Sequence, residues 1–224
     1  MTSQSGTEIG LTGPVPEVER SELVERARAF AAADRRTLLG VTGAPGAGKS
    51  TLGDEIRSWT RGVARVVGMD GFHICKARLA ELGRLDRMGA IDTFDAAGLV
   101  TLLRRLRDPG AEVVYAPEFR REIEEPIAGA VAIEPEARLV VIEGNYLLAA
   151  EEPWDQVRGL LDEVWYCEAD EELRVANLIA RHRTFGKSPE DARRWALGPD
   201  QRNAELIVRT RLRADLIVRP ALEA

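Results

Sequence analysis

One glycine-rich segment constrains this chain more strongly than any other part of its sequence. It reads Gly43-Ala44-Pro45-Gly46-Ala47-Gly48-Lys49-Ser50-Thr51 and matches the pattern GxxxxGK(S/T) in full. An apolar strand is predicted at 37–42 before it, and a helix is predicted after it to about residue 60. Glycines let the backbone curl so that N–H groups face phosphate oxygens, and the helix dipole adds positive potential. The segment therefore predicts a nucleotide site, with Lys49 near the β- and γ-phosphates of ATP and Ser50 on Mg²⁺.

Two carboxylates follow further predicted strands. Asp70 comes directly after a strand predicted at 63–69, and Glu143 ends the apolar run 139–142, which is typical of a strand buried on both faces. Strands alternate with helices along the chain, which predicts an α/β fold of the P-loop type: a three-layer sandwich whose mostly parallel sheet carries helices on both faces. Ligands gather at the carboxyl ends of strands in such sheets. We therefore expect the glycine-rich loop, Asp70 and Glu143 to share one site.

Each of these acids also has a simpler reading. Glu143 either holds a metal ion, directly or through water, or is simply an acid at the end of a strand. The glycine-rich loop upstream favours the metal-binding role. Asp70 is either a base that accepts the proton of an attacking hydroxyl or part of an Asp-Gly turn. The spacing of Asp70 alone favours neither reading.

Other elements are predicted from apolar spacing alone. Helices are expected at 95–107 and 171–183, with a further helix running to about residue 207 after a basic loop. Short strands are expected at 111–115, 130–133, 164–167 and 216–218. The stretch from Arg174 to Arg194 is rich in cations, and Arg174 and Arg181 share one face of their predicted helix. It is either a solvated charged face or a small basic lid over ATP, which we place at about 181–195.

Composition narrows the function classes. The net charge of -6 and the pI near 5.2 argue against a surface that wraps nucleic acid. Cys75 and Cys167 match no metal-binding or redox spacing, which indicates reduced thiols in a cytoplasmic protein. No apolar run approaches the ~20 residues that cross a bilayer, so no membrane partner is expected. Residues 1–16 are interpreted as a loose tail and 17–224 as a single domain, and a homodimer remains open.

Several segments together resemble one family of P-loop proteins. They are the glycine-rich loop, Met69-Asp70-Gly71-Phe72-His73, the stretch GAIDTFD at 89–95, the stretch IEGNYL at 142–147, the arginine-rich segment and Ala214-Asp215-Leu216-Ile217-Val218. The chain resembles, over roughly residues 20–220, the family of uridine kinase, phosphoribulokinase and bacterial pantothenate kinase. The resemblance implies transfer of the γ-phosphoryl group of ATP, with Mg²⁺, to a hydroxyl of a small-molecule acceptor.

The resemblance also implies roles for single residues. It makes Asp70 the base, places Glu143 near the metal, and makes Arg174, Arg181 and Arg183 lid residues that contact the nucleotide. With Lys49, Arg181 would stabilise charge during the transfer. The residues expected to face the acceptor are Asp70, His73, Tyr115, Phe119, Arg120 and Arg121.

Two departures from the family pattern leave the acceptor open. Relatives often carry Phe-Asp-Arg where this chain has Phe119-Arg120-Arg121, and Ile91 replaces a usual proline. Pantothenate, nucleosides, sugars and other polyols all remain candidate acceptors, and we favour a nucleoside or a sugar. Two further functions stay open: a nucleotide-binding regulatory protein with little transfer activity, and a nucleoside-monophosphate kinase, which Arg120 and Arg121 support.

Overall fold

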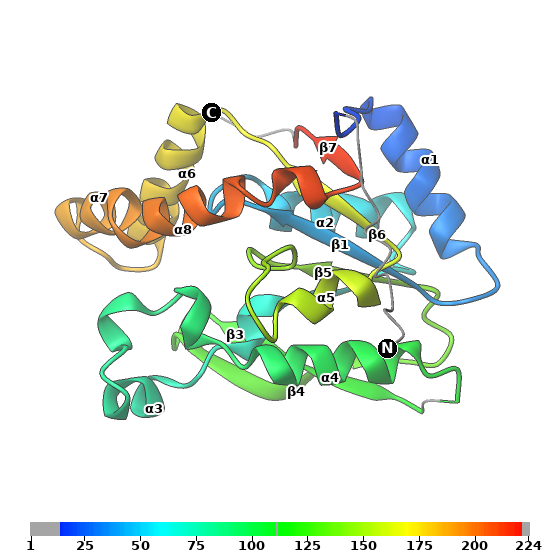
Figure 1. Ribbon diagram of the computed structural model, residues 1–224, viewed down its shortest axis with the longest axis horizontal. Coiled ribbons are helices and arrows are strands. Elements are labelled where there is room, and N and C mark those ends of the chain that lie inside the picture. The colour runs from blue at the N-terminus through cyan, green and yellow to red at the C-terminus, as the bar shows by residue number, and fades with distance from the viewer. Residues whose placement is uncertain (1–13, 111, 221–224) are drawn as a thin grey trace, which may run out of the picture.

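The structure is a computed structural model that describes residues 14–110 and 112–220. These residues form a five-stranded parallel sheet in the order β2-β5-β1-β6-β7 (Figure 1). The strands are β1 (Thr37–Gly43), β2 (Arg65–Gly68), β5 (Leu139–Glu143), β6 (Glu163–Cys167) and β7 (Leu216–Val218). The parallel sheet predicted from alternating strands and helices is therefore confirmed.

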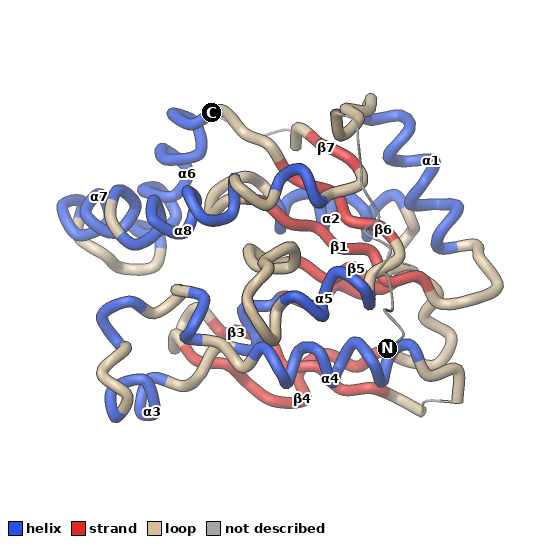
Figure 2. Tube along the Cα trace, viewed as in Figure 1, coloured by secondary structure: helices blue, strands red, loops and turns tan. Residues whose placement is uncertain are grey.

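Helices cover both faces of this sheet (Figure 2). On one face, α1 (Arg20–Ala31) and α2 (Lys49–Trp59) pack through Leu23 and Leu52 against Val41 of β1. On the other face lie α4 (Ala96–Arg107), α5 (Asp155–Leu160) and α8 (Pro199–Val208). Alternation along β1 separates the two cores, because Leu38 belongs to one cluster and Leu39 to the other. The expected three-layer arrangement is confirmed.

Strand register brings three carboxyl ends together. β1 pairs with β5 from Thr37–Leu139 to Val41–Glu143. β2 pairs with the other side of β5, where Gly68 lies opposite Glu143. Consequently the loop after β1, the 3-10 helix Met69–Phe72 (η1) after β2, and Glu143 at the end of β5 all lie at one edge of the sheet.

A separate antiparallel hairpin flanks this edge. β3 (Val114–Arg120) pairs with β4 (Glu125–Ile133), and neither strand is part of the main sheet. The predicted strands at 111–115 and 130–133 were therefore too short, and residue 111 lies outside the described part of the chain. The hairpin packs closely on η1: a Cβ atom on Gly71 would lie only 2.4 Å from the carbonyl oxygen of Pro117. Only glycine allows this approach.

The arginine-rich segment forms two helices before α8. They are α6 (Glu171–Thr184) and α7 (Pro189–Leu197), grouped at one end of the molecule, while the short helix α3 (Lys76–Glu81) lies across from them (Figure 1). The single helix predicted to run to about residue 207 is wrong. It breaks at Gly198, whose φ of -105° and ψ of -96° are not helical, and Pro199 then begins α8.

The last residue of the predicted N-terminal tail is bound to the main sheet. Residues 1–13 lie outside the described part of the chain. Pro16, however, accepts a hydrogen bond of 2.9 Å from the backbone N–H of Ile217, and Glu17 pairs with Ile217 in a parallel bridge. The chain is thus bound to β7 from Pro16 onward. Among the helices of residues 14–110 and 112–220, none is long and apolar enough to cross a membrane.

Candidate active site

The glycine-rich loop wraps the start of α2. Gly46 and Gly48 both have φ of +83°, and a Cβ on Gly46 would meet the carbonyl oxygen of Arg174 at 2.6 Å. Lys49 begins α2, and its Nζ atom donates to the carbonyl oxygens of Gly43 and Ala44 at 3.0 Å each. Burial lowers the pKa of Lys49. The loop therefore presents a backbone concavity, a helix N-terminus and a buried amine to one space.

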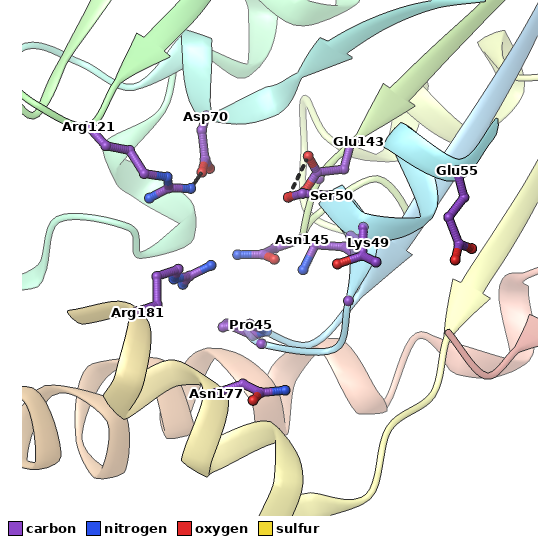
Figure 3. Close-up of a pocket in the computed structure, with 14 residues that line it drawn as sticks. Pro45, Lys49, Ser50, Glu55, Asp70, Arg121, Glu143, Asn145, Asn177 and Arg181 are labelled. Carbon is purple, nitrogen blue, oxygen red and sulfur yellow. Dashed lines mark hydrogen bonds and ion pairs between the residues drawn. The ribbon is translucent and has the colours of Figure 1, made fainter. Parts of the chain in front are cut away.

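A hydroxyl and a carboxylate meet beside this loop. The Ser50 hydroxyl donates to Oε2 of Glu143 at 3.1 Å (Figure 3). Burial raises the pKa of Glu143, because a charged carboxylate loses hydration there, although Lys49 opposes the shift. In the described part of the chain, no cluster of three or more histidine, cysteine or acidic side chains could hold a metal ion by itself. Any metal here would need oxygen ligands from outside the protein.

Asp70 lies across from the loop on η1. Its Oδ2 atom accepts a hydrogen bond of 3.1 Å from the Arg121 guanidinium (Figure 3). Burial alone would raise the pKa of this carboxyl, but His73, Arg121, Arg181 and Lys49 outweigh burial and lower it. The Asp70 side chain is 38% exposed, so an approaching molecule can reach it. Asp70 is therefore an ionised, accessible carboxylate surrounded by cations.

Two adjoining cavities meet at Asp70. The first encloses about 630 Å³ and is lined by residues including Lys49, Ser50 and Glu143. The second encloses about 500 Å³ and extends toward α6 and α7. Both are lined by Pro45, Asp70, Arg121, Asn145 and Arg181. Among the loop residues, Pro45, Gly46, Gly48, Lys49, Ser50 and Thr51 line the first cavity, whereas Gly43, Ala44 and Ala47 do not.

The three arginines expected to contact the nucleotide have different places. Arg181 lines both cavities from α6 and points toward the space between the loop and Asp70 (Figure 3). Arg174 is only 2% exposed and lines neither cavity; its guanidinium donates to the Pro45 carbonyl at 3.0 Å and to Glu171. It supports the loop from behind. Arg183 is exposed and lines neither cavity.

Only some of the residues expected to face the acceptor line the second cavity. His73, Phe119 and Arg121 line the second cavity. Arg120 and Tyr115 do not, which corrects their placement: Arg120 pairs with Glu118 at 2.7 Å on the exposed face of β3, and Tyr115 is 58% exposed. Side chains alternate between the faces of a strand, and a bulge between Ala116 and Glu118 shifts that alternation. Tyr115, Glu118 and Arg120 consequently share the outer face.

Several lining residues were not predicted from the sequence. They include Asn145, Asn177, Glu55, Phe185, Lys187 and Trp195. Asn145 had a detectable signal, because it follows a buried strand in Glu143-Gly144-Asn145. Phe185 and Trp195 fall within the lid predicted at about 181–195, but nothing in the sequence indicated which of its side chains line the cavity, since a bend between α6 and α7 brings these two there.

Comparisons with known proteins agree with this geometry, although no family model matches the chain. The chain is 38% identical over 153 residues to an ATP-dependent kinase-like protein of Aspergillus versicolor, covering 64% of this chain and 89% of that protein. It is 33% identical to a candidate uridine kinase of Schizosaccharomyces pombe, covering 74% of each. Among solved structures, a candidate fructose transport system kinase from Silicibacter sp. TM1040 superposes with a TM-score of 0.80 at 34% identity, covering 89% of this chain and 98% of that one.

Proposed function

Because the chain belongs to the uridine kinase and phosphoribulokinase family of P-loop kinases, and is thus an ATP-dependent small-molecule kinase, we propose that it phosphorylates a hydroxyl of a nucleoside or a sugar. One observation carries the proposal. The phosphate-binding loop and an ionised carboxylate, Asp70, face each other where two cavities meet. A phosphoryl donor in one cavity and an acceptor in the other would react at that junction.

The first cavity suits the phosphates of ATP. Backbone N–H groups of the loop would bind the phosphate oxygens, and the dipole of α2 favours their negative charge. Lys49 would exchange the carbonyls of Gly43 and Ala44 for the β- and γ-phosphates. Arg181 would approach the γ-phosphate from α6 and offset the charge that builds up on its oxygens.

The residues beside the loop fit Mg²⁺. This ion prefers oxygen ligands and takes only one or two carboxylates from the protein, with phosphates and water as the remaining ligands. The adjacent Ser50 hydroxyl and Glu143 carboxylate meet that requirement. When bound, Mg²⁺ neutralises charge on the β- and γ-phosphates. Burial raises the pKa of Glu143 although Lys49 lowers it, and a bound cation would favour the ionised carboxylate.

Asp70 is proposed as the base. The acceptor hydroxyl oxygen forms a bond to the γ-phosphorus while its proton passes to the Asp70 carboxylate. The bond from the γ-phosphorus to the bridging oxygen breaks, and its electrons leave with ADP. The lowered pKa keeps Asp70 ionised at neutral pH, so that it can accept this proton.

The acceptor would occupy the second cavity. Its volume of about 500 Å³ lies within the usual range for small-molecule sites. Aromatic rings of Phe94, Phe119, Phe185 and Trp195 line it together with polar groups, a mixture that suits the faces and hydroxyls of a sugar or nucleoside. The names of the uridine kinase-like and fructose kinase-like relatives support the same class.

A metabolite screen coupled to ADP release tests this function. Nucleosides and sugars should raise ADP release above the basal rate, and the product should carry a new phosphate ester. Lys49→Ala should lower turnover by at least about 100-fold, because it removes a charge that the transition state needs. ATP turnover that no metabolite stimulates would instead favour a regulatory nucleotide-binding protein. A product in which the new phosphate is attached to the phosphate of a nucleotide, rather than to a hydroxyl, would favour a nucleoside-monophosphate kinase.

A further inference from the structure

Arg121 connects three parts of the junction between the cavities. It follows β3 directly, and its guanidinium donates to Asp70 at 3.1 Å. The guanidinium carbon lies 5.9 Å from the ring centroid of Phe119 on the hairpin and 5.8 Å from that of Phe185 at the end of α6. One cation therefore stands between the hairpin, the end of α6 and the carboxylate proposed as base (Figure 3).

The second cavity carries an excess of positive charge. Lys76, Arg121, Arg181 and Lys187 line it, against the carboxylates of Asp70, Glu124 and Asp200. Asp200 is already engaged by the Nε2 atom of His182 at 2.7 Å. Within residues 14–110 and 112–220, Lys76, Arg181 and Lys187 form no ion pair. Arg181 is assigned to the γ-phosphate of ATP, so a neutral acceptor would leave Lys76 and Lys187 without a counter-ion, whereas an anionic one would supply it.

The ion pair between Arg121 and Asp70 makes the Asp70 carboxylate less able to act as a base. A carboxylate held by a guanidinium is a weaker proton acceptor, since the cation stabilises its ionised form. The guanidinium also occupies Oδ2, one of the two oxygens that could accept the proton. Both side chains are about one-third exposed, at 35% and 38%, and ion pairs of that exposure are readily exchanged.

We propose that Arg121 selects acceptors that carry an anionic group, and that this anion draws the guanidinium away from Asp70 and frees the carboxylate for the acceptor hydroxyl. The inference rests on the proposed kinase function and adds the acceptor's charge to it. A carboxylate or a phosphate monoester fits, because each offers two oxygens to the planar fork of an arginine. Sugar acids and phosphorylated sugars or nucleosides are the matching classes. Arg121 is a positioning and specificity residue, acting on Asp70 through the ion pair.

Matched acceptor pairs test the inference. Each pair joins an anionic acceptor to a neutral one with the same skeleton: a sugar acid and its amide, which differ little except in charge, a sugar phosphate and the free sugar, and a nucleoside monophosphate and the nucleoside. The wild type should prefer the anionic member of a pair. A preference for the sugar acid would indicate recognition of a carboxylate, and a preference for the sugar phosphate or the nucleotide would indicate recognition of a phosphate. Arg121→Met should lower kcat/KM for the anionic acceptor by about 10- to 100-fold, the range of one charge-assisted hydrogen bond, and should not lower it for the neutral partner, because the substitution also frees Asp70. Equal loss for both members would overturn the inference.

Arg120→Met is the matched control. Arg120 is adjacent in sequence and equally charged, but it pairs with Glu118 on the outer face of β3. It should leave the acceptor preference and the KM for ATP unchanged. A loss of preference in Arg120→Met as large as in Arg121→Met would assign the effect to the general charge of the hairpin and overturn the role of Arg121.

A second measurement needs no acceptor. With the loop filled by Mg²⁺ and a non-hydrolysable ATP analogue, inorganic phosphate is titrated and the arginine Nε–H signals are followed by NMR. Phosphate should shift the Arg121 signal, identified by its loss in Arg121→Met. Asp70→Asn should tighten phosphate binding, and this gain should disappear in the double variant, because Asp70 and the anion compete for one guanidinium.

The outcomes separate the two proposals. Failure of the ATP analogue to bind would contradict the kinase function itself. Normal binding of the analogue, with phosphate affinity the same in the wild type and in Arg121→Met, would overturn the inference about Arg121 alone. If no acceptor in the panel is phosphorylated, the phosphate titration decides the inference.

Discussion

At the scale of single residues, Asp70 owes its properties to its neighbours rather than to its own burial. Burial would raise its pKa, yet the charges of His73, Arg121, Arg181 and Lys49 reverse the shift. The other acids near the site are committed elsewhere. Asp92 pairs with Arg87 at 2.7 Å, and Asp95 accepts from the backbone N–H of Gly98 as the N-cap of α4. Asp70 lines both cavities, whereas Asp92 and Asp95 line neither.

Asp70→Asn should therefore reduce kcat and spare ATP binding. Asparagine keeps the shape of the side chain but cannot take the proton, and positioned bases are worth about 10²- to 10⁴-fold. The measurement is kcat together with ATP affinity, which should stay within a few-fold. Asp92→Asn is the control and should retain nearly normal kcat. A kcat close to wild type in Asp70→Asn would contradict the base, since asparagine also serves well in turns.

Arg174 leads to a different prediction, because its guanidinium bonds to the protein. It donates to the Pro45 carbonyl and to Glu171 while almost fully buried. Arg174→Met should lower the free energy of unfolding of the nucleotide-free protein by about 1–3 kcal/mol, since the buried carbonyl of Pro45 loses its donor. Arg183→Met, on the exposed face near the end of the same helix, should change it by less than about 0.5 kcal/mol. Denaturant unfolding decides; an unchanged midpoint for Arg174→Met would refute its supporting role.

At the scale of elements, the glycine-rich loop was the most predictable part of the structure. Its chemistry is local, because a run of nine residues already contains the turn glycines, Lys49 and Ser50. The places of Asp70 and Glu143 followed from one general rule, that parallel strands end at the same edge of a sheet. Both predictions needed no knowledge of distant packing.

Other elements depended on contacts that the sequence does not encode locally. Nothing in the apolar pattern of β3 and β4 says that they leave the main sheet, because alternation is the same in any strand. The family resemblance implied that both Arg120 and Arg121 face the acceptor; the structure separates them, because Arg120 ends β3 on its outer face and Arg121 lies in the turn that follows. By contrast, the end of α7 was predictable from the pair Gly198-Pro199, which commonly marks a turn. The helical spacing of the apolar residues on both sides led instead to the prediction of one continuous helix.

The segment 181–195 is proposed to act as a lid, and hydrogen exchange can test that. It spans the end of α6, Gly186 with φ of +91° and most of α7, and it carries Arg181, Phe185 and Lys187 on the second cavity. Its amides should exchange faster in the free protein than in the complex with nucleotide and acceptor. The segment 99–106 of α4, none of whose residues lines either cavity, should exchange equally in both. Equal protection of 181–195 in the two states would argue for a fixed wall.

At the scale of the whole molecule, one partly buried acid joins the layers far from the active site. Asp162 lies before β6 and accepts from the backbone N–H of Leu38 in β1 at 2.8 Å. It also pairs with Arg107 of α4 at 2.9 Å and with Arg35 at 2.9 Å. Its side chain is only 16% exposed. The central strand, one covering helix and the segment leading into β1 therefore meet on a single carboxylate, consistent with the proposal that residues 17–224 fold as one domain.

The pKa of Asp162 predicts how stability changes with acid. Burial would raise it, but the Leu38 N–H and the two arginines lower it below the ordinary value of 3.8. A lowered pKa means that the folded state binds the proton more weakly than the unfolded chain. The stabilisation is therefore fully present above about pH 4 and is lost as the pH falls through the lowered pKa.

Asp162→Asn should consequently destabilise the protein near neutral pH and much less in acid. Asparagine can still accept one hydrogen bond but leaves Arg107 and Arg35 without their charge partner, so the free energy of unfolding at pH 7 should fall by about 1–3 kcal/mol. Urea unfolding between pH 7 and pH 3 should show the two proteins converging at the acid end. Asp54→Asn, an exposed acid on α2 with no ion pair among the described residues, should follow the wild type throughout. A constant gap between Asp162→Asn and the wild type at every pH would mean that Asp162 stabilises the fold by shape and hydrogen bonding alone, and that its charge contributes nothing.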